Sequence, residues 1–76
     1  MSHICIIEDD TAIAEIERDY LEINGFTVSI ATDGVSGLNL TQTESFDLIL
    51  LDLMLPQLDG FTLCRKLRER LDIPIL

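Results

Sequence analysis

The stretch Phe46–Phe61, FDLILLDLMLPQLDGF, decides how this chain folds. Within it, Leu48–Leu51 form a continuous apolar run, which is too short to cross a membrane and is typical of a strand buried on both faces. Asp52 ends that run, because a carboxylate is costly inside such a strand. We therefore expect Asp52 at the carboxyl end of a strand, where open α/β sheets bind ligands, and Asp59 as the N-cap of a helix starting at Gly60.

A second acidic group follows another apolar run near the start of the chain. Ile4–Ile7 has the pattern of a buried strand and is followed directly by Glu8, Asp9 and Asp10. If this strand is a parallel neighbour of the strand that ends at Asp52, their carboxylates share one small rim. The repulsion between them would be relieved by a hard divalent cation with oxygen ligands, such as Mg2+. We read Asp10 as part of the cap of the next helix.

The rest of the chain alternates between strand and helix patterns. Helix 11–24 carries one apolar stripe, the pattern of a helix that packs on a core. Helix 35–43 is rich in poor helix formers such as Gly37, so we expect it to be short or mobile. The alternation indicates an α/β fold with a parallel sheet. The expected strands are residues 4–7, 26–31, 47–51 and the start of a fourth at 72–76, and the helices are 11–24, 35–43 and 60–71.

The length, charge and composition of the chain limit the functions that it can have. The chain has 76 residues and a formal charge of −9, so we expect one domain that does not itself grip nucleic acid. Four of its basic residues fall in one helix, which indicates an outward face, with a docking patch as the alternative. Both cysteines have the pattern of small core hydrophobes. The basic residues are Arg65, Lys66, Arg68 and Arg70, and the cysteines are Cys5 and Cys64.

Together these motifs resemble the receiver domain of two-component response regulators. The resemblance rests on the pair Glu8-Asp9, on Asp52 and on LPQLDG at 55–60, and it extends over residues 1–76 as one partial receiver domain. It implies flavodoxin-like (βα) repeats with strand order 2-1-3-4. It also implies that strand five and the last two helices of the family lie outside these residues.

The resemblance implies a signalling module and not an enzyme. Asp52 would accept a phosphoryl group from a histidine kinase, in the cytoplasm and without membrane contact. Mg2+ would be held by Glu8, Asp9, Asp52 and the backbone carbonyl of Met54. Relatives of this kind often carry a DNA-binding domain after the receiver.

Other interpretations stay open. A haloacid dehalogenase-like phosphohydrolase also has its nucleophile after a parallel strand, but it needs a second aspartate where this chain has Met54. A structural fragment that folds by self-association is the main alternative. The family's switch Ser/Thr and Lys would follow residue 76, so we expect impaired phosphorylation. We also expect a homo-oligomer, formed through the edge of the fourth strand or an uncovered sheet face.

Overall fold

The centre of the molecule is a parallel sheet of three strands in the order β2-β1-β3. The computed structural model of the chain describes residues 2–51, 60–68 and 73–76. The strands are β1 (His3–Ile7), β2 (Thr27–Ala31) and β3 (Leu48–Leu51). The parallel α/β arrangement and the relative order of the first three strands are confirmed.

The last described residues lie beside β3, where the fourth strand is expected. Ile75 forms an isolated parallel bridge with Ile49. The backbone N–H of Ile49 donates to the carbonyl of Pro74 at 3.0 Å, and that of Leu51 donates to the carbonyl of Leu76 at 2.8 Å. Since β1 pairs with one side of β3, residues 73–76 lie on the other side of β3. This extends the strand order toward the predicted 2-1-3-4.

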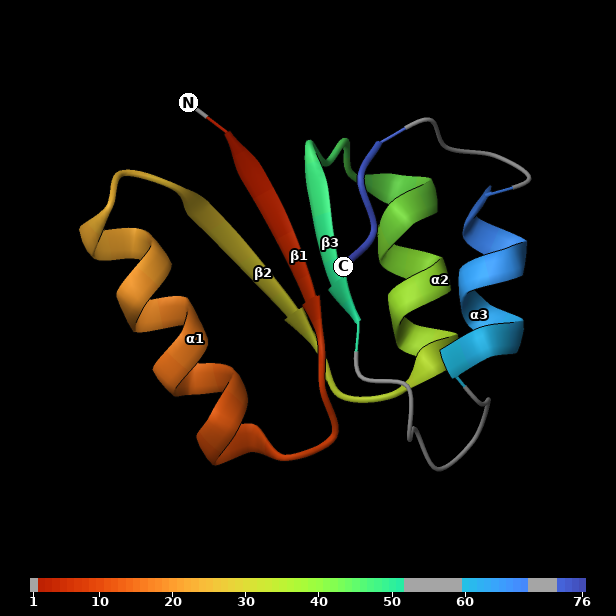
Figure 1. The fold of residues 1–76 in the computed structure, drawn as a ribbon, viewed down its shortest axis with the longest axis horizontal. Helices are drawn as coiled ribbons and strands as arrows, with labels where there is room; N and C mark the ends of the chain where they lie inside the picture. Colours follow the sequence, from red (N-terminus) through yellow and green to blue (C-terminus); the bar gives the residue numbers. More distant parts are fainter. Residues whose placement is uncertain (1, 52–59, 69–72) are drawn as a thin grey trace.

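Three helices cover the two faces of this sheet. Helix α1 (Thr11–Ile23) lies on one face, and α2 (Gly34–Thr43) and α3 (Gly60–Arg68) lie on the other (Figure 1). Each strand-to-strand connection thus crosses a face of the sheet, as parallel pairing requires. No helix among the described residues is long and apolar enough to span a membrane. The predicted cap Asp59 and the predicted helix residues Arg70 and Leu71 lie outside the described residues.

Local sequence signals set the ends of α1. The Asp10 carboxylate accepts hydrogen bonds from the backbone N–H groups of Ala12 and Ile13 at 3.0 and 3.2 Å. It therefore satisfies two of the donors that a helix start leaves open, and its role as a cap is confirmed. After the helix, Gly25 has φ +91°, a conformation that favours glycine.

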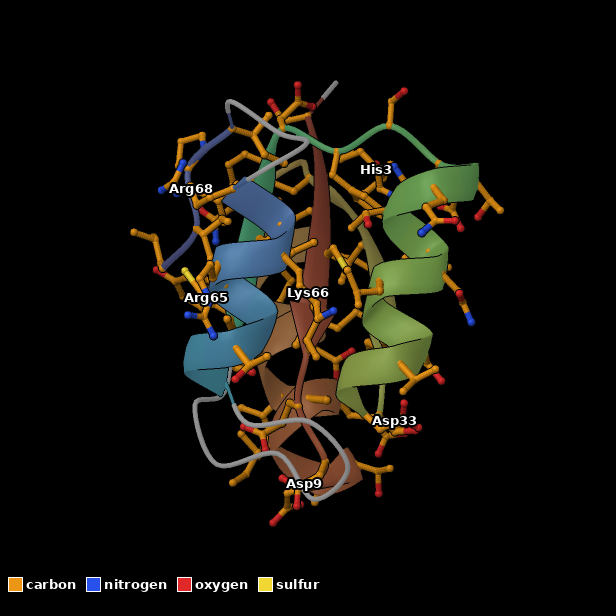
Figure 2. The ribbon with its side chains drawn as sticks, turned by 90° about the vertical axis from the view of Figure 1, so that its right-hand side faces the viewer. His3, Asp9, Asp33, Arg65, Lys66 and Arg68 are labelled. Atoms are coloured by element: carbon orange, nitrogen blue, oxygen red, sulfur yellow. The ribbon has the colours of Figure 1, made fainter. Side chains whose placement is uncertain are left out.

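The sheet separates two apolar clusters. The cluster under α2 and α3 contains Cys5, Ile7 and Leu67, all fully buried. The cluster under α1 is built on Ile4, Ile6 and Ala14. The core position of Cys5 is confirmed, whereas Cys64 is only half-buried; both are free thiols. The described basic residues of α3 are exposed, as an outward face requires; they are Arg65, Lys66 and Arg68 (Figure 2).

Most of the apolar stripe predicted for α1, which comprised Ile13, Ile16, Tyr20 and Leu21, does not lie against the sheet. Ile13, Ile16 and Tyr20 are 45%, 69% and 68% exposed, whereas Ala14 is fully buried. The sheet-facing side carries Ala14 and half-buried Leu21, which are two turns apart on the helix, so Leu21 is the one residue of the stripe that packs as predicted. Two neighbouring faces of α1 are therefore apolar, and the contact with the sheet uses the one that carries the small side chain of Ala14.

The apolar run of β3 is less buried than predicted. Only Ile49 is fully buried, and the other residues of the strand are half-buried. Leu48 and Leu50 alternate with Ile49 and face the α1 side of the sheet, where they contact only the edge of the cluster around Ala14. Among the described residues, α1 is the only helix on that face, and it lies mainly over β2 and β1.

Helix α2 is regular over its full length despite its weak helix formers. The Asp33 carboxylate caps it, accepting the backbone N–H of Ser36 at 2.7 Å. Gly37 is buried against Ile7 of β1. Capping and close packing therefore offset the low propensity, and α2 spans the whole of the predicted range 35–43.

Candidate functional site

The described parts of β1 and β3 end level with each other. Ile7 and Leu51 are partners in the parallel register, as are Ile7 and Ala31 on the other side. The acidic residues Glu8 and Asp9 follow Ile7 directly, so they lie at the carboxyl edge of the sheet. This is the edge at which open parallel sheets bind ligands.

Backbone contacts hold the acidic pair at that edge. The N–H of Glu8 donates to the carbonyl of Ala31 at 3.0 Å, which continues the pairing of β1 with β2 by one residue. The Glu8 carboxylate accepts the N–H of Asp10 at 3.2 Å. Glu8 is half-buried and Asp9 is exposed. Figure 2 shows Asp9 and Asp33, the cap of α2, at the same end of the molecule.

The structure describes two of the four predicted metal ligands. Glu8 and Asp9 lie where predicted, whereas Asp52 and Met54 lie outside the described residues. The two carboxylates supply the hard oxygen donors that Mg2+ prefers, so the donor chemistry fits. Over residues 2–51, 60–68 and 73–76, no group of three acidic, histidine or cysteine side chains is arranged to hold a metal.

A further acidic residue borders the site. A hollow of about 170 Å³ lies next to the ends of β1 and β3, and Glu8 and Glu17 both line it. Its other lining residues are Ile7, Leu50, Leu51 and Leu76. Glu17 was not among the site residues predicted from the sequence. Its spacing, three after Ala14 and four before Leu21, was the signal that it shares their sheet-facing side.

Comparison with known proteins identifies the family. The family model of the response regulator receiver domain matches residues 4–76. The chain therefore belongs to the response regulator receiver domains, which are signalling modules. The resemblance inferred from Glu8-Asp9, Asp52 and the 55–60 motif is confirmed at the level of the family.

Two of the relatives found by sequence are named as regulators of transcription. The DNA-binding dual master transcriptional regulator RpaA of Synechocystis is 49% identical over 79 residues, which span 100% of this chain and 33% of RpaA. The transcriptional regulatory protein CseB of Streptomyces coelicolor is 41% identical, over 99% of this chain and 32% of CseB. The chain thus spans about a third of the length of these relatives.

Solved receiver structures share the fold closely. The response regulator TrrA of Thermotoga maritima, solved in complex with Mg2+ and BeF, superposes with a TM-score of 0.94 at 25% identity. The match covers 99% of this chain and 66% of the TrrA chain. TrrA was also solved in complex with the histidine kinase ThkA, and that match has a TM-score of 0.93. The flavodoxin-like fold class is thereby confirmed.

Proposed function

We propose that this chain is the phospho-acceptor receiver module of a two-component response regulator, with Asp52 as the residue phosphorylated by a histidine kinase. The observation that carries the proposal is the register of Ile7 with Leu51. In sequence, Glu8-Asp9 and Asp52 are the residues that directly follow this pair. Family membership over residues 4–76 supports the same assignment.

The chemistry requires a nucleophile and a means of offsetting negative charge. A carboxylate oxygen of Asp52 attacks the phosphorus, the bond to the donor breaks, and an acyl phosphate forms. Glu8, Asp9, Asp52 and the carbonyl of Met54 would hold Mg2+, which offsets charge between the carboxylate and the phosphoryl oxygens. The complex of TrrA with Mg2+ and BeF supports this choice of metal.

Helix α1 offers a docking face for the kinase. It begins two residues after Asp9, and its exposed apolar residues repeat with a spacing of three and four. They are Ile13, Ile16, Tyr20 and Ile23, the last 84% exposed. Exposed apolar residues on adjacent turns mark a surface for a partner. The solved complex of TrrA with ThkA supports a kinase as that partner.

The remaining parts of the proposal concern context. The signalling role points to the cytoplasm and to a module that is not itself an enzyme. The charge of −9 argues against direct contact between this segment and nucleic acid. The longer relatives are DNA-binding or transcriptional regulators, so DNA contact in this system would come from other parts of the protein.

The decisive experiment is an amide-resolved NMR titration with Mg2+, followed by incubation with a small phosphodonor such as acetyl phosphate. We expect shifts centred on Glu8, Asp9, Asp52 and Met54, and then a mass increase of one phosphoryl group that Asp52→Asn abolishes. A folded protein indifferent to Mg2+ and to the donor would contradict the proposal.

Self-association is the second candidate, favoured by an apolar hollow on the α1 side of the sheet. The hollow measures about 340 Å³, and leucine and isoleucine side chains from β1, α1 and β3 line much of it. A second copy of the chain would cover this hollow. Light scattering at micromolar concentration tests this, and a strictly monomeric protein would rule it out. The apolar lining residues are Ile4, Leu21, Phe26, Leu48, Leu50 and Leu76.

A further inference from the structure

Gly37 lies where α2 comes closest to the strand that carries the acidic pair. A Cβ atom on Gly37 would stand 2.5 Å from Cδ1 and 2.9 Å from Cγ1 of Ile7. Ordinary contacts between carbon atoms are about 3.5–4.0 Å long. Glycine is unfavourable inside a helix, so its presence here matches a helix that must approach β1 without a side chain in between.

Ile7 has little freedom to move away from such a contact. It is fully buried and belongs to the cluster that includes Cys5, Phe46 and Ile49. Its backbone is paired on one side with β2 and on the other with β3. A β-branched side chain also has few available rotamers. A group that displaces the Ile7 side chain should therefore also displace the backbone at the end of β1.

The acidic pair Glu8-Asp9 comes immediately after the end of β1. Glu8 follows Ile7 directly, and its N–H holds the carbonyl of Ala31 at 3.0 Å. We propose that Gly37 is a positioning residue for Glu8 and Asp9: its missing side chain lets α2 lie against Ile7, and this contact sets where β1 delivers the two carboxylates. The link to Mg2+ rests on the function proposed above, whereas the link to the placement of Glu8 and Asp9 does not.

A double-mutant cycle tests this arrangement. Gly37→Ala adds the methyl group that meets Ile7, and Ile7→Val removes Cδ1, the atom nearest to it. Asn39→Ala is the control, because Asn39 is exposed on the same helix and gains helix propensity in the same way. For each protein, amide resonances of Glu8 and Asp9 are recorded without metal, Mg2+ is then titrated, and urea unfolding is measured.

We expect Gly37→Ala to shift the metal-free resonances of Glu8 and Asp9 and to weaken Mg2+ binding roughly tenfold, as substitutions outside the ligand shell commonly do. Adding Ile7→Val should restore part of the Mg2+ affinity and of the resonance positions, because it removes the contact at 2.5 Å and leaves the one at 2.9 Å. The Asn39→Ala control should change neither quantity. Wild-type positions of Glu8 and Asp9 in a folded Gly37→Ala protein would overturn the inference. So would a double variant that restores nothing.

Two further outcomes are also decisive. If Gly37→Ala does not fold, the comparison is made between the double variant and Ile7→Val alone. The inference then requires that the double variant folds and that its Glu8 and Asp9 resonances lie closer to wild type than those of Ile7→Val. Any other result overturns it. If the wild-type protein does not bind Mg2+, the proposed function fails. The metal-free resonances of the cycle then still decide whether Gly37 positions the pair.

Discussion

The imidazole Nε2 of His3, in β1, lies 3.0 Å from the hydroxyl oxygen of Ser29, in β2. The same hydroxyl lies 3.1 Å from the carboxylate of Glu44, the C-cap residue of α2. Nδ1 of His3 is 3.0 Å from the carbonyl of Ser45, and because a carbonyl only accepts, Nδ1 carries a proton in this geometry. One side chain thus joins two strands to the end of α2, at the edge of the sheet opposite the acidic pair.

Removing the hydroxyl at the centre of this network should destabilise the fold. We expect Ser29→Ala to lower the free energy of unfolding by about 1 kcal/mol, since it removes the hydroxyl that bonds both half-buried His3 and the exposed Glu44 carboxylate. Urea unfolding measures the change. Gln42→Ala, at an exposed position of α2, should have a much smaller effect. Equal effects of the two substitutions would show that the network adds nothing to stability.

The buried thiol of Cys5 should be unreactive in the folded protein. Burial, with a smaller contribution from the Glu44 carboxylate, raises the pKa of Cys5 to about 12. The thiolate is the reactive form, so iodoacetamide at pH 8 should modify half-buried Cys64 first and Cys5 only on unfolding. Mass spectrometry of digested samples over time measures both rates. Comparable rates in the folded protein would contradict the burial of Cys5.

The same raised pKa predicts a loss of stability at high pH. Above about pH 9 the Cys5 thiol ionises in the unfolded chain, whereas the folded protein keeps its proton until about pH 12. The unfolded state then binds fewer protons, so the stabilising contribution is present below pH 9 and falls as pH rises. Unfolding free energies of wild type and Cys5→Ala should therefore converge between these pH values. A constant difference would count against the prediction.

Substitutions of Asp9 and Asp10 should affect different properties, Mg2+ binding for Asp9 and stability for Asp10. Asp10→Ala removes the cap of α1 and should cost about 1 kcal/mol of stability while leaving Mg2+ binding nearly unchanged. Asp9→Asn should do the reverse, weakening Mg2+ binding by about tenfold with little change in stability, because Asp9 is exposed. Urea unfolding and a Mg2+ titration of each variant check this. A loss of Mg2+ affinity in Asp10→Ala would instead make Asp10 a ligand.

The exposed face of α1 should matter to a kinase and not to a small donor. Ile16 is 69% exposed, so Ile16→Asp should leave the fold intact. We expect it to slow phosphotransfer from a phosphorylated histidine kinase and to leave phosphorylation by acetyl phosphate unchanged. Glu15→Gln, on the polar side of the same helix, serves as the control. Equal slowing with both donors would place the defect at Asp52 and not at docking.

Much of the fold could be predicted because its signals are local. The apolar runs before Glu8 and Asp52, the cap at Asp10 and the glycine at position 25 each act through neighbouring residues. Parallel pairing follows from the alternation of strands and helices, since parallel strands need crossovers. The acidic pair could be assigned to one sheet edge for the same reason, and the register of Ile7 with Leu51 agrees with it.

The order of the elements, their caps and the residue types at the carboxyl ends of two strands could all be read from the sequence. The three-dimensional packing decides which apolar face of α1 meets the sheet, because the small side chain of Ala14 allows a closer approach than Ile13, Ile16 or Tyr20 would. It also brought Glu17 to the hollow beside Glu8 and made Gly37 a contact of Ile7. These features depend on the distance between elements far apart in the chain, and periodicity carries no information about that distance.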